Sequence, residues 1–290
     1  MSGLDRLELT GLTGYGHHGV YDEERRDGQP FVVDVVVHLD LGRAGAGDAL
    51  ADTIHYGELA AEIVAAIERD PVDLIETLAE RIAALVLAHR PARAVEVTLH
   101  KPKAPIPVPF DDVAVRIRRE WTPAIVAIGA NLGDRESTIR QAVLGLASHR
   151  RIRVRRGSPL VETPALRTTG VDEAAPAYLN AVVAIETTLP ASGLLVELQR
   201  LEDHHGRTRE VRWGDRTLDL DLIVYGDARI DTEELTVPHP RAHERAFVLA
   251  PWAAMDESAE LPGRGPVVEL LDRALARGER VEPYPAEPLA

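Results

Sequence analysis

The chain contains the run Phe31-Val32-Val33-Asp34-Val35-Val36-Val37-His38-Leu39-Asp40-Leu41, which is dominated by β-branched residues. Such a run is typical of a β-strand, because branched side chains pack well on a pleated surface. A second strand is expected before it, over residues 6–12. Two helices with regularly spaced apolar residues and two short strands follow, over 57–69, 75–89, 95–100 and 113–119. The order ββααββ predicts an α+β unit with both helices on one face of an antiparallel sheet.

A break at Trp121-Thr122-Pro123 separates this unit from the rest of the chain. A length of 290 residues suits about two domains, and we expect them to span 1–121 and 122–290. In the second domain we expect strands over 124–129, 152–161, 179–187 and 217–225, and helices over 135–147, 190–204 and 266–277. The final segment, 283–290, is expected to be a loose tail.

Composition narrows the class of protein. Hydrophobic residues make up 45% of the chain, but no run approaches the roughly 18 apolar residues that span a membrane. The net charge of −14 disfavours general nucleic-acid binding, which needs clustered basic side chains. The chain has no cysteine, so it has no disulfide and no thiolate metal site. We expect a cytoplasmic protein without a secretory signal and without a nucleic-acid or membrane partner.

Lysine is rare in this chain. Of the 33 basic residues only Lys101 and Lys103 are lysines, and all the others are arginines. Genome composition alone produces such a bias. A lysine that persists among arginines is nevertheless a candidate for proton transfer, because the pKa of an amine is tunable whereas a guanidinium stays protonated.

Asp219 and Asp221 lie one residue apart in an apolar segment that is expected to form a strand. Strand alternation directs both carboxylates to one face, about 6.5–7 Å apart. Carboxylate oxygens suit Mg²⁺, which completes its shell with water and phosphate. Four arginines suited to neutralising phosphate charge precede the pair: Arg207, Arg209, Arg212 and Arg216. The combination predicts a Mg-ATP-dependent transferase, and the alternative is a polar strand face beside a solvated basic loop.

Five motifs punctuate the second domain: Val126-Ala-Ile-Gly-Ala-Asn-Leu-Gly133, Glu162-Thr-Pro-Ala-Leu166, Tyr178-Leu-Asn-Ala181, Arg212-Trp-Gly-Asp-Arg-Thr-Leu-Asp-Leu-Asp-Leu222 and Val237-Pro-His-Pro-Arg241. In this order, over about 124–280, they resemble the family of 6-hydroxymethyl-7,8-dihydropterin pyrophosphokinase. The resemblance implies a ferredoxin-like α/β domain. It also implies transfer of a pyrophosphoryl group from ATP to the pterin hydroxymethyl group, with Mg²⁺ as cofactor and AMP as the released product.

The same resemblance assigns roles by position. Asp219 and Asp221 bind the metal, and Arg207 and Arg209 assist the transfer. The residues implied in the pterin pocket are Thr163, Pro164, Leu166, Tyr178, Asn180, Trp213 and Phe247. The residues implied in nucleotide binding are Gln199, Glu202, Arg212, Arg216, His239 and Arg245. The sequence departs from the family pattern in a longer segment over 167–177 and in Pro240, which stands where an aromatic residue is often seen.

The first domain carries a set of polar residues suited to acid–base chemistry on a heterocycle: Glu24, Tyr56, Glu76 and Lys101. A carboxylate grips an amidine-like pair of N–H groups, while a lysine and a tyrosine relay protons. Zinc is an alternative because histidines lie nearby, but His17 and His18 would point opposite ways on a strand. Glu76 also has a simpler reading as an acid favoured at the start of a helix.

These residues lie in the segments Gly16-His-His-Gly19 with Glu24, Asp52-Thr-Ile-His-Tyr-Gly57, Leu74-Ile-Glu-Thr-Leu-Ala-Glu-Arg-Ile82 and Leu99-His-Lys-Pro-Lys-Ala-Pro-Ile106. Their spacing over about 4–120 resembles dihydroneopterin aldolase. The resemblance implies the tunnelling fold, a ring-shaped homo-tetramer or octamer, and cleavage of 7,8-dihydroneopterin to glycolaldehyde and 6-hydroxymethyl-7,8-dihydropterin without a cofactor. It makes Lys101 the general acid/base, assisted by Tyr56 and Glu24, in a pterin pocket that includes Glu76, Ile75 and Ile54.

The two resemblances support each other, because the product of the first reaction is the acceptor of the second. We therefore predict a bifunctional folate-biosynthesis enzyme whose small-molecule partners are pterins and ATP. Two alternatives stay open. The first domain could be chiefly an epimerase of dihydroneopterin or its triphosphate, or one half could be a non-catalytic scaffold.

Overall fold

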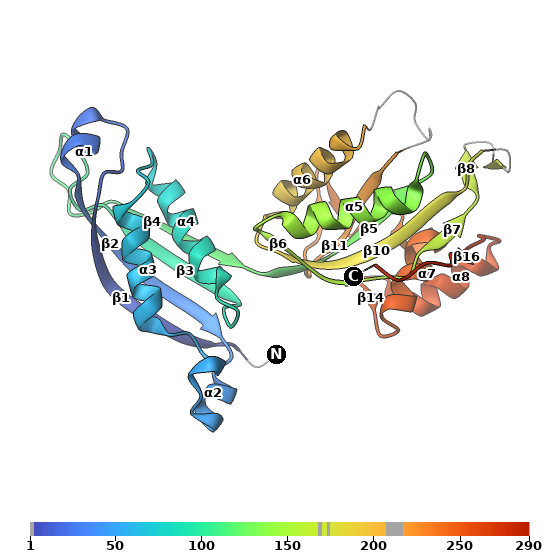
Figure 1. Cartoon of the computed structure of the whole chain (residues 1–290), viewed down its shortest axis with the longest axis horizontal. Helices are drawn as coiled ribbons and strands as arrows, with labels where there is room; N and C mark the ends of the chain where they lie inside the picture. Colours follow the sequence, from blue (N-terminus) through green and yellow to red (C-terminus); the bar gives the residue numbers. More distant parts are fainter. Residues whose placement is uncertain (1–2, 168–169, 173–174, 207–216, 290) are drawn as a thin grey trace. The chain divides into compact units, whose positions relative to one another are not determined.

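The computed structural model describes residues 3–167, 170–172, 175–206 and 217–289. The chain divides into two compact units, Met1–Trp121 and Thr122–Ala290. Both combine helices with antiparallel strands, which confirms the predicted α+β class (Figure 1). Within the described ranges, no helix combines the length and the apolar character needed to cross a membrane.

The first unit is a four-stranded antiparallel sheet in the order β1-β2-β3-β4. Its strands are β1 (Asp5–Gly16), β2 (Gln29–Leu39), β3 (Ala94–His100) and β4 (Ala114–Glu120). Two long helices cover one face, α3 (Tyr56–Glu68) and α4 (Ile75–Ala88) (Figure 1). This confirms the expected ββααββ order. Three short elements were not expected, α1 (Asp22–Asp27), α2 (Gly42–Gly47) and the 3₁₀ turn η1 (Leu50–Asp52).

The alternation along β2 explains how this unit packs. Every second residue is fully buried against the helices: Phe31, Val33, Val35, Val37 and Leu39. Each such side chain contributes about 1.5–3 kcal/mol when it leaves water. The helices supply matching apolar faces through Leu59, Ile63, Ile67, Leu78, Ile82 and Val86. The apolar residues of β2 and those of the two helices therefore pack together in one core.

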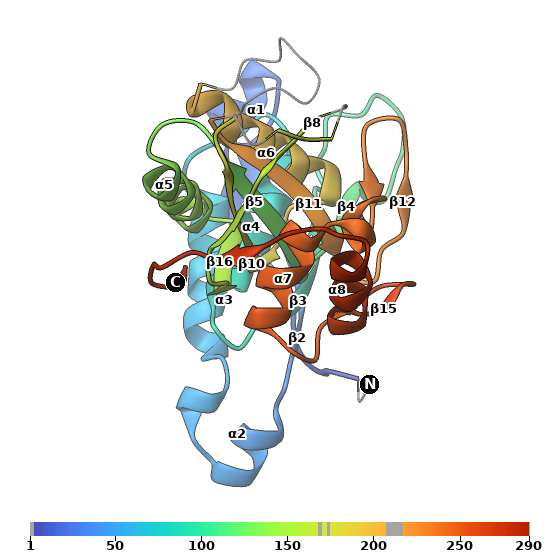
Figure 2. The same ribbon diagram turned by 90° about the vertical axis from the view of Figure 1, so that its right-hand side faces the viewer.

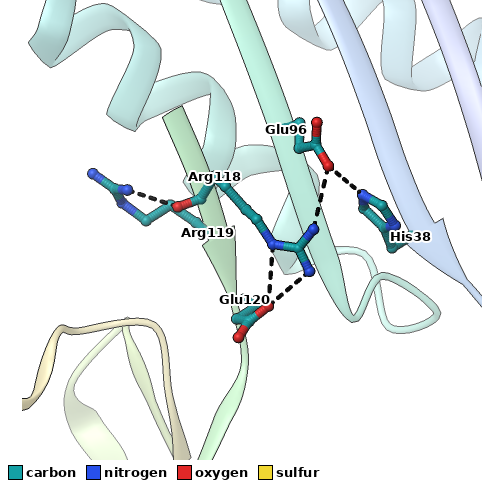
Figure 3. Close-up of polar contacts among 5 residues, drawn as sticks. All are labelled: His38, Glu96, Arg118, Arg119 and Glu120. Atoms are coloured by element: carbon teal, nitrogen blue, oxygen red, sulfur yellow. Dashed lines mark hydrogen bonds and ion pairs between the residues drawn. The ribbon is translucent and has the colours of Figure 1, made fainter. Parts of the chain in front are cut away.

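The opposite face of this sheet is charged. Figure 3 shows Glu96 of β3 accepting hydrogen bonds from His38 (2.9 Å) and Arg118 (3.2 Å). Arg118 also donates to Glu120 at 2.9 Å. Arg119, the next residue of β4, lies on the helix side, where it pairs with Glu80 of α4, and its Nη1 donates to the carbonyl oxygen of Arg118 at 2.7 Å. One face of the sheet thus packs on the helices, and the other carries a polar network, as an antiparallel sheet permits.

The second unit is a six-stranded antiparallel sheet in the order β11-β5-β10-β7-β16, with β6 also paired to β10. Its strands are β5 (Thr122–Ala130), β6 (Ile152–Gly157), β7 (Val161–Thr163), β10 (Tyr178–Thr187), β11 (Asp219–Tyr225) and β16 (Glu282–Pro283). Smaller pairs are β8 (Ala165–Arg167) with β9 (Gly170–Asp172), β12 (Ile230–Asp231) with β13 (Thr236–Val237), and β14 (Glu260–Leu261) with β15 (Gly265–Pro266).

Helices cover both faces of this sheet. One core contains residues of α5 (Arg135–Ser148) and α6 (Ala191–His204). The other contains residues of α7 (Ala246–Met255) and α8 (Val267–Ala276), which lie side by side in Figure 1 and Figure 2. A 3₁₀ turn, η2 (Ala242–Glu244), precedes α7. The helices expected over 135–147, 190–204 and 266–277 are confirmed, whereas α7 was not expected.

Two expectations for the second unit were wrong. The single strand expected over 152–161 is interrupted, because the Oγ of Ser158 accepts from the amide of Val182 (2.9 Å) and Pro159 has no N–H to donate. The segment 283–290 is not loose where it is described. β16 pairs with β7, and Leu289, 4% exposed, donates its amide to the carbonyl of Ser158 at 3.1 Å.

Candidate active sites

Glu24 and Lys101 form a buried ion pair in the first unit. Lys101 follows the last residue of β3, Glu24 lies in α1, and the Nζ–Oε1 distance is 2.6 Å. Lys101 is 8% exposed and Glu24 is 7% exposed. Burial pushes the pKa of Glu24 upward, but the hydrogen bonds from Lys101, the Tyr21 amide and Gln29 outweigh it and hold the pKa below its ordinary value. Glu24 is therefore ionised, and both members of the pair are shielded from water.

The backbone around Glu24 is shaped to admit this carboxylate. The amide of Tyr21 donates to Oε2 at 3.2 Å, and the Nε2 of Gln29 donates to Oε1 at 3.1 Å. Gly19 has a φ of +150°, and a Cβ at this position would overlap the Glu24 carboxylate. The glycine that ends the predicted Gly16-His-His-Gly19 motif is thus required by the close approach of the acid.

Gln29 is a functional candidate that the sequence did not reveal. Its Oε1 is buried and has no hydrogen-bond partner among the described residues. Reversing the amide would turn this oxygen toward the Glu24 carboxylate, so the donating orientation of Nε2 is the favoured one. A buried acceptor of this kind suits an incoming N–H or O–H donor. The available signal was a polar residue at the start of the most apolar strand.

His17 and His18 do not form a metal site. The Nε2 of His18 donates to the carbonyl of Ile67 (2.6 Å), and its Nδ1 accepts from the amide of Val72 (3.0 Å). This pattern defines the neutral tautomer, and burial lowers the pKa of His18. The Nδ1 of His17 lies 2.9 Å from the carbonyl of Arg25. Both histidines hold loops together, and no group of three or more potential metal-binding side chains occurs among the described residues.

The other residues implied for this site lie apart from the buried pair. Tyr56 is 65% exposed at the first position of α3, and Glu76 is exposed in the first turn of α4. Ile75 is half-buried, and Ile54 is buried. Within the described chain, contacts join Glu24 to Lys101 but join neither Tyr56 nor Glu76 to them. One copy of the unit therefore presents part of the predicted set as a buried pair and part on its surface.

In the second unit, Asp219 and Asp221 point to the same side of the edge strand β11. Leu220 and Leu222, which alternate with them, are buried in the core on the other side. Both aspartates are half-buried, and the Nη1 of Arg245 lies 3.7 Å from the Oδ2 of Asp221. Two partly solvated carboxylates on a rigid strand fit a divalent cation that keeps several waters.

The strand register brings the aspartates close to the residues implied for the pterin. Asp219 pairs with Gly129 on β5, and Gly129 pairs with Asn180 on β10. Gly129 leaves room between them, since a Cβ there would lie 3.1 Å from the Oδ1 of Asn180. The Nδ2 of Asn180 donates to the Oγ1 of Thr163 at 2.9 Å. Both aspartates and Asn180 therefore lie on one face of the sheet, and the backbones of Asp219 and Asn180 are two strand spacings, or about 9.6 Å, apart.

Glu202 of α6 accepts a hydrogen bond from the backbone of the edge strand β11. It is almost fully buried on α6, and its Oε1 accepts from the amide of Leu220 at 2.7 Å. Gln199 lies one turn earlier on the same helix and is partly exposed. This hydrogen bond ties α6 to the strand that carries both aspartates.

A cationic and aromatic group borders the same strand. The amide of His239 donates to the carbonyl of Ile223 at 2.9 Å, and the Arg245 guanidinium lies 5.4 Å from the centre of the Phe247 ring. Burial, with the charges of Arg245 and Arg241, lowers the pKa of His239 to about 4. His239 is therefore neutral near pH 7, and the positive charge at this edge comes from arginine.

Arg135 is a second residue that the sequence did not reveal. Its Nη1 donates to the Oε1 of Glu162 (2.7 Å) and to the carbonyl of Ala177 (2.6 Å). These contacts join the start of α5 to Glu162 and to Ala177. Glu162 lies close in the sequence to Pro164, and Ala177 precedes Tyr178; Pro164 and Tyr178 are both half-buried. Several predicted residues lie outside the described part: Arg207, Arg209, Arg212, Trp213, Arg216 and the side chain of Leu166.

Two family profiles match the chain. The profile of dihydroneopterin aldolase matches residues 7–118, and that of 7,8-dihydro-6-hydroxymethylpterin-pyrophosphokinase matches residues 125–257. The first part is 57% identical over 116 residues to a dihydroneopterin aldolase of Streptomyces coelicolor, covering 40% of this chain and 98% of that protein. The second part is 45% identical over 137 residues to a 2-amino-4-hydroxy-6-hydroxymethyldihydropteridine pyrophosphokinase of Bacillus subtilis, covering 47% of this chain and 80% of that protein.

The chain belongs to both families. It is a bifunctional enzyme of folate biosynthesis, with dihydroneopterin aldolase and pyrophosphokinase activities, which confirms the family assignments made from the motifs. A third relative spans both parts. The protein named "Folic acid synthesis protein fol1" of Pneumocystis carinii is 30% identical over 277 residues, covering 89% of this chain and 36% of that protein. The scaffold alternative, in which one half has no activity, is thereby disfavoured.

Proposed function

We propose that residues 1–121 cleave 7,8-dihydroneopterin with Lys101 as the general acid/base. The contact that carries the proposal is the 2.6 Å ion pair between Lys101 and Glu24. A lysine paired with a desolvated carboxylate is held in one place and exchanges protons without a metal. The acceptor oxygen of Gln29 lies in the same group and takes an N–H or O–H of the bound pterin.

The reaction needs an electron sink for the electron pair of the carbon–carbon bond that breaks. As a side-chain hydroxyl loses its proton, the adjacent carbon–carbon bond breaks and its electron pair moves into the C=N bond of the pterin ring. Glycolaldehyde leaves, and protonation of the resulting enamine carbon gives the hydroxymethyl product. Lys101 mediates these proton transfers with Tyr56, so no cofactor is needed for this half.

The exposed position of Tyr56 and Glu76 supports a site completed by a second copy of the chain. Glu76 grips the amidine-like N–H pair of the pterin bidentately, with Ile75 and Ile54 as apolar walls. In this proposal the first unit forms a ring-shaped tetramer or octamer. Neighbouring copies then bring the Tyr56 and Glu76 of one subunit to the Glu24–Lys101 pair of the next.

We propose that residues 122–290 transfer pyrophosphate from ATP to the hydroxymethyl group. Asp219 and Asp221 hold Mg²⁺, which when bound neutralises charge on the phosphate oxygens. Asn180 and Thr163 read the polar edge of the pterin, and Phe247 stacks on its ring. Pro164, Leu166, Tyr178 and Trp213 complete the pterin pocket. The nucleotide is bound by Gln199, Glu202, Arg212, Arg216, His239 and Arg245, while Arg207 and Arg209 assist the transfer.

A coupled assay tests both halves. The full chain receives dihydroneopterin and Mg-ATP, and glycolaldehyde and AMP are followed together. Lys101→Ala should stop release of both products, and added 6-hydroxymethyl-dihydropterin should restore AMP. Asp219→Ala should stop AMP formation and leave glycolaldehyde release intact. An epimer without glycolaldehyde would instead assign the first unit to epimerisation. We also propose that the enzyme works in the cytoplasm without nucleic-acid or membrane partners, as its acidic composition suggests.

A further inference from the structure

His100, the last residue of β3, lies between two carboxylates. Its Nδ1 is 2.5 Å from the Oδ2 of Asp112, and its Nε2 is 3.4 Å from the Oδ2 of Asp34. A neutral imidazole has one N–H, so it donates to only one of these acids. Only the imidazolium donates to both. The hydrogen bond that His100 donates to Asp112 is the main cause that raises the pKa of His100 above its ordinary value, and Asp34 adds to it.

Each carboxylate is anchored to a different part of the unit. The Oδ1 of Asp34 accepts from the amide of Gly11 at 2.7 Å, at the point where the β1–β2 register shifts. Asp112 lies at the far end of the loop that leaves β3, next to Val113. The carbonyl of Val113 accepts from the amide of Lys101 at 2.7 Å. A polar chain thus runs from β1 across β2 and β3 to the loop that begins at Lys101.

The charged side chains nearest to His100 on this face, on β3 and β4, have partners of their own. The Nε of Arg116 on β4 donates to the Oγ1 of Thr98 at 3.1 Å, and Glu96 accepts from His38 and Arg118 (Figure 3). Lys101 is next along the chain, but its amine contacts Glu24. Neighbouring residues in an extended chain point opposite ways. His100 therefore acts on the reacting amine only through the backbone.

We propose that His100 is a positioning residue of the lyase: clamped as a cation between Asp34 and Asp112, it fixes the backbone that carries Lys101. This inference rests on the proposed role of Lys101. Turnover of the lyase falls when His100 loses its proton, because one end of the clamp opens and the lysine loses its alignment with Glu24. Small misplacements of a catalytic group cost on the order of tenfold to a hundredfold in rate.

The test compares pH–rate profiles of glycolaldehyde release in the full chain. In Asp112→Asn, the decline on the alkaline side should move to lower pH, because His100 loses the carboxylate that holds its proton. The rate at the acidic end should stay within about twofold of the parent. In His100→Gln, kcat should fall by roughly tenfold or more. The His100 decline should disappear, and KM should change by less than about twofold.

Two controls separate positioning from damage. His89→Gln changes another carboxylate-bound histidine, whose Nε2 lies 2.9 Å from Glu62, and should leave the profile unchanged. The AMP-forming rate with added hydroxymethyl-dihydropterin reports whether the chain is intact. The proposal would be overturned if the rate of glycolaldehyde release declined at the same alkaline pH in all variants. It would also be overturned if a variant lost the same fraction of the parent's rate at every pH. If Lys101→Ala retained turnover, the role of Lys101 would fail instead, which is a separate outcome.

Discussion

Replacing Lys101 by Met should break the buried ion pair and lower the free energy of unfolding by an amount that depends on pH. Methionine keeps the length of the side chain but removes the charge that lies 2.6 Å from Glu24. Both partners are buried, so Glu24 would remain as an uncompensated charge. Breaking such a pair costs about 3–5 kcal/mol of unfolding free energy. The double variant with Glu24→Gln removes both charges, and its cost should be smaller by roughly 3 kcal/mol.

The sign of the pH effect follows from Glu24. In the parent its pKa lies below the ordinary value of 4.5, so the pair stabilises the fold above that pH and less as pH falls. In Lys101→Met the carboxylate is desolvated without its cation, which raises its pKa and favours the protonated acid. The deficit of the variant relative to the parent should therefore be large at pH 7 and shrink toward pH 4.

Hydrogen exchange under increasing urea measures this effect, with peptides from 1–121 as the report and peptides from 122–290 as the internal reference. Lyase turnover should fall by about 10²–10⁴-fold, the range of general acid–base catalysis. The reasoning would be refuted by a single variant no less stable than the double variant, or by a deficit that is equal at pH 4 and pH 7.

Three further predictions concern other groups. Asp219→Asn should lower AMP formation on the order of 10²-fold or more at fixed Mg²⁺ while glycolaldehyde release continues, and equal loss of both would contradict separate sites. Gly19→Ala should displace the Glu24 carboxylate, lose lyase activity and cost about 1–3 kcal/mol by denaturant unfolding, whereas Gly45→Ala, with open space around it, should do neither. The pKa of about 4 for His239 predicts that acidification from pH 6.5 to 4 destabilises the second unit, because the unfolded chain takes up the proton first; His239→Gln should flatten that part of the stability profile measured by hydrogen exchange.

Elements with a clear local period were predictable from the sequence. The alternation over Phe31–Leu39 and the helical spacing in α3 and α4 are recorded in neighbouring residues, so each could be read without its partner. α7 was missed because it is apolar on nearly all sides and contains Pro251, which hides the helical pattern. The docking of Leu289 was missed because it depends on Gly157 and Ser158, far away in the chain.

Some residues of the candidate sites could likewise be identified from the sequence, and others could not. Lys101 could be singled out by its rarity, and Asp219 with Asp221 by alternation on a strand. Gln29, Arg135 and His100 could not, because each gains its meaning from a partner that only the fold supplies. A lone glutamine, arginine or histidine carries no local signal of what it will contact. Reading such residues from sequence requires the tertiary pairing first.

The two candidate sites differ in how deeply they bury their charged side chains, and the proposed reactions account for the difference. The proposed lyase site buries both members of its ion pair, Lys101 and Glu24, which holds the amine in the fixed position that the proposed proton transfers need. The proposed Mg²⁺ site leaves Asp219 and Asp221 partly exposed, which leaves room for the water and phosphate oxygens that such an ion keeps. Burying the aspartates as deeply as Glu24 would leave no room for those oxygens. Exposing Lys101 as much as the aspartates would let water compete for its contact with Glu24.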